Sequence, residues 1–334
     1  MIGPRLETFS VMLEDVEEGH PARQGRLAEA IDRLPPSLTA FDLDCTFPRD
    51  PCTELDQAIS SMILRCGSTL NNLAIDLELS ELAVNRVLQL PHLERLRISQ
   101  DVPRSVAAHS ESLQSSEVFP SLRELTLFAQ PDNWLSFLTS QEGIRKNLRV
   151  LVCAWEPRDG RRALVMQALA LKNLVDLRVG RRCPTLWHQC NFDLTDDDIS
   201  LIATTLPHLT RLRLGITCEA NTCPNTFKSL LDLSTGCTGL TELQIHFNTT
   251  NLEEDIKSTM ASESAKKPRC RLAVFSANEA ALSGSEDSEL IAQGFLGVFP
   301  MLESFYPATV GEGWGGVAEV VERTRQNRLV QSLS

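Results

Sequence analysis

The chain has 334 residues, of which 42% are hydrophobic and 23% charged, and its formal net charge is −12 at pH 7. This composition supplies a full core, and the negative charge argues against non-specific attraction to nucleic acid or anionic lipid. No apolar run approaches the ~18 residues of a membrane span, and the opening residues lack a basic region followed by an apolar one. We therefore expect an intracellular protein, cytoplasmic or nuclear and not secreted, whose cysteines are reduced thiols.

Two segments of the sequence are nearly identical, LPHLERLRIS at 90–99 and LPHLTRLRLG at 206–215. Their common core is the pattern Leu-x-x-Leu-x-Leu, in which conservative replacements of leucine occur. In chain order, the copies of this pattern begin at Leu6, Leu38, Leu70, Leu93, Leu122, Leu148, Leu174, Leu209, Leu240, Leu272 and Leu302. The copies are 23 to 35 residues apart, which is the longer period of leucine-rich repeats. We therefore predict about eleven irregular repeats.

Each copy predicts a short strand whose second and third apolar residues point inward, because alternate residues of a strand share a face. The segments between copies predict crossover helices, since most carry apolar residues three and four apart. The predicted helices lie at 23–34, 54–66, 81–90, 162–173, 195–206, 226–234 and 289–299. Thr195 and Asp198 predict a capping box at the start of one of them. The polar stretch 258–269 predicts a loop.

Stacked copies predict an α/β leucine-rich-repeat solenoid, a horseshoe with a parallel β-sheet on its concave face and helices on its convex face. We expect residues 1–334 to form a single solenoid, with a C-terminal loop and capping helix at 307–334. The segment GEGWGG at 311–316 matches Gly-x-Gly-x-x-Gly. A dinucleotide site would also need a further strand and an acidic residue beyond the helix, so we interpret these glycines as a loop.

The phrases LPHLxRLRL and FPSLRELTL, together with the irregular period, resemble the repeat region of fungal F-box proteins from about Pro4 to Tyr306. The resemblance implies a non-enzymatic protein-binding scaffold, the part of a ubiquitin-ligase subunit that recognises the substrate. In that family an N-terminal F-box docks onto an adaptor of a cullin-type ligase. Only five residues precede Leu6, so we expect the F-box itself to be absent from this chain.

The residues beside the inward leucines should line the concave face and meet a partner protein. The candidate binding residues are Arg95, Arg97, Asp176, Arg178, Arg211, Arg213, Glu242, Gln244 and His246. An acidic segment of a partner would suit the arginines, whose planar groups pair with carboxylates. The alternative is that these arginines are solvated or paired with Asp176 and Glu242. Both interpretations stay open at this point.

Cysteine and histidine residues gather in two loops of neighbouring repeats, and zinc takes such ligands. They are Cys183, His188, Cys190, Cys218 and Cys223. Because cysteine is also an ordinary residue of repeat cores, we expect no metal and leave zinc as the alternative.

We expect no catalytic residues and no cofactor, because Gly-x-Ser-x-Gly is absent and the six histidines are dispersed. The expected partner is a protein, with no nucleic acid, no membrane and no small-molecule substrate. Two alternatives stay open within this fold. The chain could be a free-standing adaptor or inhibitor, similar to ribonuclease inhibitor, or a GTPase-activating repeat protein that uses an exposed arginine.

Overall fold

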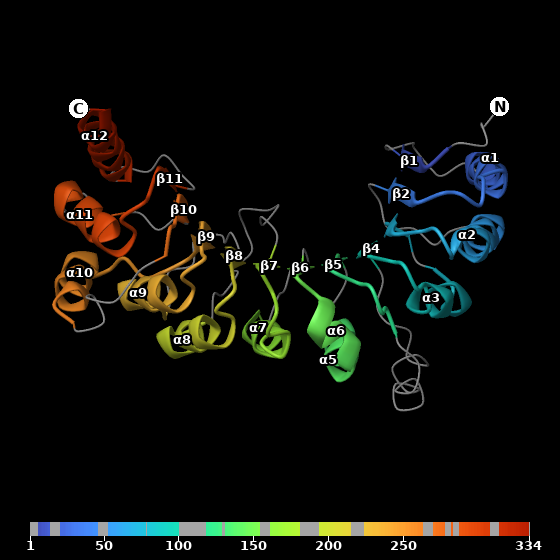
Figure 1. Ribbon diagram of the computed structural model, residues 1–334, viewed down its shortest axis with the longest axis horizontal. Helices are drawn as coiled ribbons and strands as arrows, with labels where there is room; N and C mark the ends of the chain where they lie inside the picture. The colour runs from blue at the N-terminus through green and yellow to red at the C-terminus, as the bar shows by residue number, and fades with distance from the viewer. Residues whose placement is uncertain are drawn as a thin grey trace. The chain divides into compact units, whose positions relative to one another are not determined.

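The computed structural model of the protein has strands and helices that alternate along the chain (Figure 1). It describes residues 6–13, 21–45, 53–77, 79–99, 118–128, 131–153, 161–180, 194–214, 224–262, 270–277, 282, 287–307 and 314–333. The chain divides into two compact units, Met1–Trp155 and Glu156–Ser334. Each unit is a parallel sheet of repeat strands with helices between them, and the predicted α/β leucine-rich-repeat fold is confirmed. The single solenoid across 1–334 stays a prediction.

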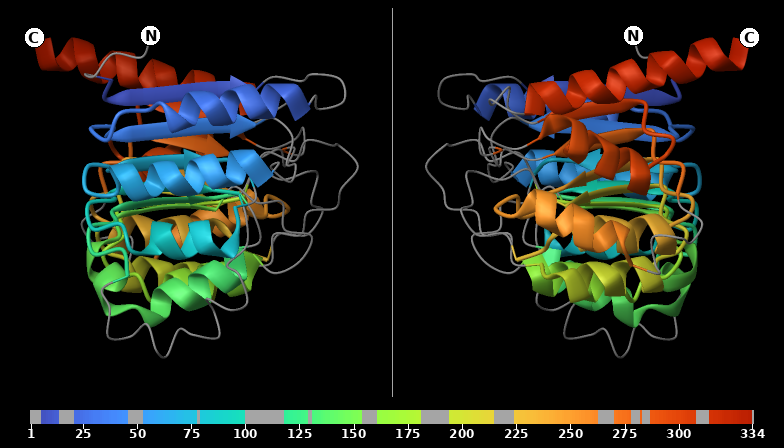
Figure 2. Two further views of the ribbon diagram at one scale, coloured as in Figure 1. Left: turned by 90° about the vertical axis from the view of Figure 1, so that its right-hand side faces the viewer. Right: turned by 90° about the vertical axis from the view of Figure 1, so that its left-hand side faces the viewer.

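Unit 1 has a parallel sheet in which neighbouring strands follow one another in the sequence. Its strands are β1 (Thr8–Leu13), β2 (Ala40–Cys45), β3 (Asn72–Ile75), β4 (Arg95–Ile98), β5 (Glu124–Leu127) and β6 (Val150–Cys153). Its helices are α1 (Pro21–Asp32), α2 (Thr53–Cys66), α3 (Glu81–Leu88), α5 (Pro131–Ser140) and α6 (Glu142–Asn147). Helices α1, α2 and α3 lie along one face of the sheet (Figure 2). The described helices of unit 1 all lie on that side of its strands (Figure 1).

Unit 2 repeats this arrangement with its own strands and helices. Its strands are β7 (Asp176–Val179), β8 (Arg211–Leu214), β9 (Glu242–Ile245), β10 (Val274–Ala277) and β11 (Ser304–Pro307). Its helices are α7 (Arg161–Ala168), α8 (Asp196–Thr205), α9 (Phe227–Gly236), α10 (Leu252–Met260), α11 (Ser288–Val298) and α12 (Trp314–Leu333). Every predicted copy of the leucine pattern therefore contains a strand.

The strands are in exact register, so equivalent residues of successive repeats form columns. In unit 2, Leu177, Leu212 and Leu243 are register partners, and all three are buried. The same column continues through Phe275 to Phe305. A single short strand exposes its apolar face, and only stacked neighbours can cover it. The leucine pattern thus creates one continuous core within each unit.

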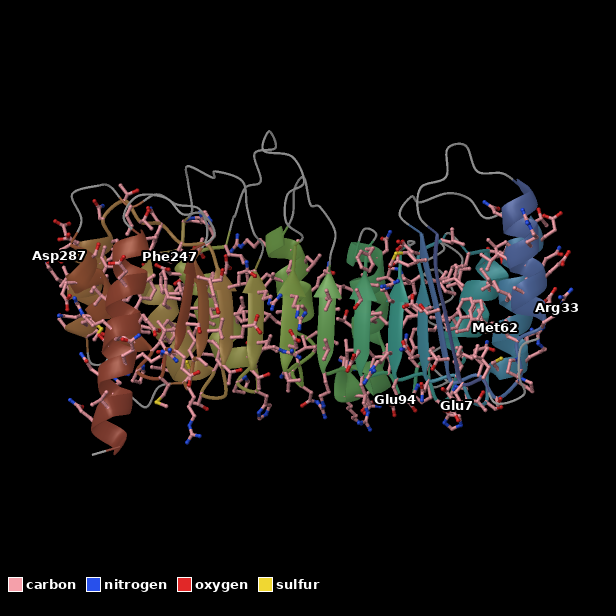
Figure 3. The ribbon with its side chains drawn as sticks, turned by 90° about the horizontal axis from the view of Figure 1, so that it is seen from above. Glu7, Arg33, Met62, Glu94, Phe247 and Asp287 are labelled. Atoms are coloured by element: carbon pink, nitrogen blue, oxygen red, sulfur yellow. The ribbon has the colours of Figure 1, made fainter. Side chains whose placement is uncertain are left out.

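A repeated backbone contact fixes this register at the start of the strands. The carbonyl oxygen of Glu7 accepts hydrogen bonds from the N–H groups of Thr39 (2.8 Å) and Ala40 (3.1 Å). The carbonyl of Glu94 does the same for Arg123 and Glu124, at 2.8 and 3.0 Å. Glu7 and Glu94 lie at the same edge of the unit 1 sheet (Figure 3). Each repeat therefore sets the position of the next one.

Three of the described helices were not predicted, namely α5, α6 and α10. Helix α10 includes Leu252, Ile256 and Thr259, which are buried at helical spacing among charged residues. The prediction of a loop over 258–269 is wrong at its start, because α10 continues to Met260. Helix α5 buries Trp134 against Phe137, with ring centroids 6.4 Å apart.

Aromatic side chains fill the core near the C-terminus of unit 2. Trp314, at the start of α12, is 1% exposed. Its ring centroid lies 5.4 Å from that of Phe305, 6.2 Å from Phe295 and 6.3 Å from Phe247. A Cβ atom added at Gly316 would lie 2.7 Å from the Ser288 hydroxyl, so α12 can approach α11 closely only because this residue is glycine. Helix α12 therefore covers the aromatic core through its first turn.

The predicted capping box at the start of α8 is confirmed. The Thr195 hydroxyl accepts a hydrogen bond from the Asp198 N–H at 3.3 Å, and the Thr195 N–H donates to the Asp198 carboxylate at 3.0 Å. Arg162 of α7 adds a bidentate ion pair to Asp198, at 2.9 and 3.0 Å. Burial alone would raise the pKa of Asp198, but the hydrogen bonds from Thr195 and Arg162 lower it below the ordinary 3.8.

We expect Asp198 to stabilise the fold only while it is ionised. A pKa lowered by folding gives stability that is fully present above the unfolded-state value, and this stability is lost as the pH falls from there through the lower folded-state value. Urea unfolding should therefore show that Asp198→Asn costs about 1–2 kcal/mol at pH 7. The cost should shrink below pH 3.8. If Asp198→Asn cost as much unfolding free energy below pH 3.8 as at pH 7, this role would be contradicted.

Candidate functional site

The open face is defined here as the face of each sheet that the helices do not cover. Strands β4 and β8 show how the sequence creates it, since Leu96 and Ile98, or Leu212 and Leu214, are buried while the intervening arginines are not. Because side chains alternate across a strand, the polar residues of all repeats share one surface within each unit. The predicted binding residues on these strands therefore belong to the open face.

In unit 1 the open face carries two arginines of β4 that pair with acidic residues on other strands. Arg95 lies 3.3 Å from the Glu124 carboxylate of β5. Arg97 reaches Asp42 at 2.9 Å and Asp44 at 3.3 Å, both on β2. Ala74 of β3 is the register partner of both Asp42 and Arg97, and its small side chain leaves room for this contact. The Arg97 guanidinium also lies over the Phe128 ring, 5.9 Å from its centroid.

In unit 2 the open face carries an arginine cluster, defined as Arg178, Arg211 and Arg213. Arg178 forms a bidentate pair with Asp176, with Nε–Oδ1 and Nη2–Oδ2 distances of 3.0 and 2.8 Å. Arg211 Nη2 lies 2.8 Å from the same Oδ2 atom. The Nε of Arg213 donates to Glu242 Oε1 at 2.6 Å. The structure thus brings five predicted binding residues together on three strands. Asp176 is fully buried beneath the arginines, so the prediction that its side chain is presented to a partner is wrong.

The pairing does not neutralise the arginine cluster. Its three guanidinium groups face two carboxylates, Asp176 and Glu242, which leaves one positive charge. The hydrogen bonds that Arg178 donates to Asp176 and the charges of both carboxylates raise the pKa of Arg178 above its ordinary value, so Arg178 stays charged. A guanidinium has five N–H donors, and the Nη1 groups of these arginines have no partner among the described residues. Donors therefore remain for a ligand.

Two other predicted site residues follow this cluster on or after β9. Gln244 is half-buried on the open face, where it is the register partner of Arg213. His246 is only 2% exposed, so the prediction that its side chain is presented on the surface is wrong. The strand ends at Ile245, and beyond it the alternation of faces no longer applies. The His246 carbonyl accepts a hydrogen bond from the buried Asn225 side chain at 2.8 Å.

The sequence analysis missed the large side chain of this face at its far end, Tyr306. Its side chain is 58% exposed on β11, next to the buried Phe305. In the degenerate copy at Leu302, Phe305 holds the inward position, and alternation then assigns Tyr306 to the open face. The signal was present in the sequence, because the pattern that identified the arginines also applies to this copy.

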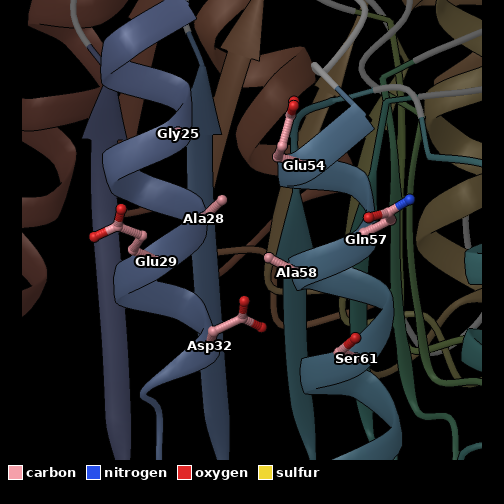
Figure 4. Close-up of a pocket in the computed structure, with 8 residues that line it drawn as sticks. All are labelled: Gly25, Ala28, Glu29, Asp32, Glu54, Gln57, Ala58 and Ser61. Carbon is pink, nitrogen blue, oxygen red and sulfur yellow. The ribbon is translucent and has the colours of Figure 1, made fainter.

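A groove of about 430 Å³ lies on the helical side of unit 1, between α1 and α2 (Figure 4). Its floor contains Gly25, Ala28 and Ala58, and its rim carries acidic side chains. Of these, Glu29 lies 3.6 Å from Arg33, and Asp32 lies 3.6 Å from Arg65. Neighbouring arginines thus already form ion pairs with two of the acidic side chains at the rim, and we assign no ligand to this groove.

The proposed zinc ligands Cys183, His188, Cys190, Cys218 and Cys223 lie outside the described residues. Within the described part of the chain, no group of histidine, cysteine and acidic residues could hold a metal ion. Burial raises the pKa of the Cys237 thiol to about 12 and that of Cys270 to about 11, so both remain protonated in the core. Among the described helices, none combines the length and apolar character that crossing a membrane requires.

Comparison with known proteins gives a distant structural likeness. No family model matches the sequence, and no curated protein matches it. Among the solved structures that match is the complex of Rad7 and Elc1 from yeast, with 12% sequence identity and a TM-score of 0.46. The match covers 84% of this chain and 65% of the other chain, so the chain spans less than two thirds of that neighbour. The fold assignment itself rests on the strand register described above.

Proposed function

We propose that this protein is a protein-binding scaffold, without catalytic activity of its own, that holds its partner on the open face of its repeat sheets. The observation that supports this most is the arginine cluster, which keeps a net positive charge and N–H donors on side chains that are partly exposed. Arginine is enriched at protein interfaces because its planar group pairs bidentately with carboxylates. An acidic segment of a partner protein suits this surface.

Photo-crosslinking tests this function directly. A benzophenone amino acid is placed at Gln244 on the open face of unit 2, and in a matched control at the exposed Leu201 of α8. We expect irradiation in cells to join a partner protein to position 244 and not to position 201. The product should disappear when Arg211 and Arg213 are both changed to Glu. Equal products from the two positions, or none from position 244, would refute the scaffold function.

We also propose a finer role, the recognition of substrates for a ubiquitin ligase. Its support is the resemblance of the repeat phrases, such as LPHLTRLRLG at 206–215, to those of F-box proteins. Ubiquitylation of the crosslinked partner should then fall when the gene for this chain is deleted, and it should return with the wild-type chain. A partner whose ubiquitylation does not change would support an adaptor or inhibitor instead.

A further inference from the structure

One row of side chains crosses the whole open face of unit 2. Through successive register pairs, Arg178, Arg213, Gln244, Ser276 and Tyr306 occupy equivalent positions on β7 to β11. Neighbouring strands lie about 4.8 Å apart, so about 19 Å separates the backbones of the first and last residues. An extended peptide rises about 3.3 Å per residue, and about six of its residues would cover this distance.

The arginine end of the row is held in place before any ligand arrives. Asp176 is fully buried, and both of its carboxylate oxygens accept hydrogen bonds from the arginine cluster. Ordering a long side chain on binding costs conformational entropy, and an arginine that is already fixed avoids much of this cost. Glu242 holds Arg213 in the same way. We therefore interpret Asp176 and Glu242 as positioning residues for the arginines.

The other end of the row is apolar. The Tyr306 side chain is exposed and therefore available to a partner. Tyrosine contributes a large contact area and is enriched among the residues that dominate binding. The small Ser276 lies beside it in the row, and Val274, two residues earlier in β10, is half-buried on the same face. A large apolar side chain of a partner can therefore contact Tyr306 over these smaller residues.

We propose that unit 2 binds an extended peptide segment across its strands, with an acidic side chain on Arg178 and Arg213 and a large apolar side chain on Tyr306. About six residues separate the two anchors. This inference rests on the proposed scaffold function and adds the chemistry and spacing of the partner. Charge selects the acidic anchor, and the distance between the arginines and the tyrosine selects the spacing.

A random-peptide phage library panned on the full chain tests this inference. We expect the enriched peptides to carry Asp or Glu and, about six residues away, an aromatic residue or leucine. A synthetic consensus peptide is then measured by fluorescence polarisation. Arg178→Gln, Arg213→Gln and Tyr306→Ala should each weaken its binding about tenfold or more. Arg97→Gln on unit 1 is the matched control and should leave the affinity unchanged.

A second variant separates positioning from charge. Asp176→Asn makes the surface more positive, so a purely electrostatic surface would bind the acidic peptide more tightly. We expect weaker binding, because the arginines lose the carboxylate that fixes them. Circular dichroism checks that the variant folds, and replacing the peptide's acidic residue by its amide should remove its response to Asp176→Asn.

The inference is overturned if the enriched peptides lack the acidic and apolar pair, if panning enriches no peptide, or if the peptide binds Asp176→Asn more tightly than the wild-type chain. Peptides whose binding depends on Arg97 and not on Arg213 would overturn it as well. In each case the crosslinking experiment decides the scaffold function separately, because it uses no peptide and makes no assumption about spacing.

Discussion

Replacing Trp314 by alanine should destabilise unit 2 by about 3–5 kcal/mol, the usual cost of removing a large aromatic side chain from a core. Trp314 contacts Phe305, Phe295 and Phe247, so its loss leaves a cavity among rings that cannot easily close it. Urea unfolding followed by far-ultraviolet circular dichroism measures the change in unfolding free energy. Hydrogen exchange should also become faster in β11, which packs against α12.

A matched control exists in the same helix. Val330 lies in α12 and is 69% exposed, so Val330→Ala should change the unfolding free energy by less than about 0.5 kcal/mol. Equal effects of the two substitutions would show that α12 does not stabilise the aromatic core.

The second large effect is expected for Leu212→Ala in the central leucine column of unit 2. Leu212 is fully buried between its register partners Leu177 and Leu243. Truncation removes buried methyl groups and leaves a cavity that the fixed strand spacing prevents from collapsing, at a cost of about 2–5 kcal/mol. The same urea titration measures this effect.

Leu201→Ala is the control for this substitution, since it removes the same atoms from the exposed surface of α8. Its effect should be close to zero. If Leu212→Ala were as mild as Leu201→Ala, the leucine column would not form the core that the register implies.

Much of the fold follows from local sequence patterns, because a repeat residue contacts mainly its own repeat and the two neighbouring ones. The spacing of Leu209, Leu212 and Leu214 was enough to predict β8 and the faces of its side chains. The capping box of Thr195 and Asp198 was equally local. Helix α10 was missed, because its apolar residues are few and its charged residues favour an interpretation as a loop.

The candidate site also has features that local sequence patterns predict and features that they do not. The sequence by itself determined that Arg178, Arg211 and Arg213 lie on the open face, because alternation along a strand is a property of the backbone. Only the tertiary structure showed that Asp176 is buried and that it holds two of these arginines. Ion pairs between repeats depend on strand register and on side-chain conformers, and residues about 30 positions apart carry no local pattern that reveals them.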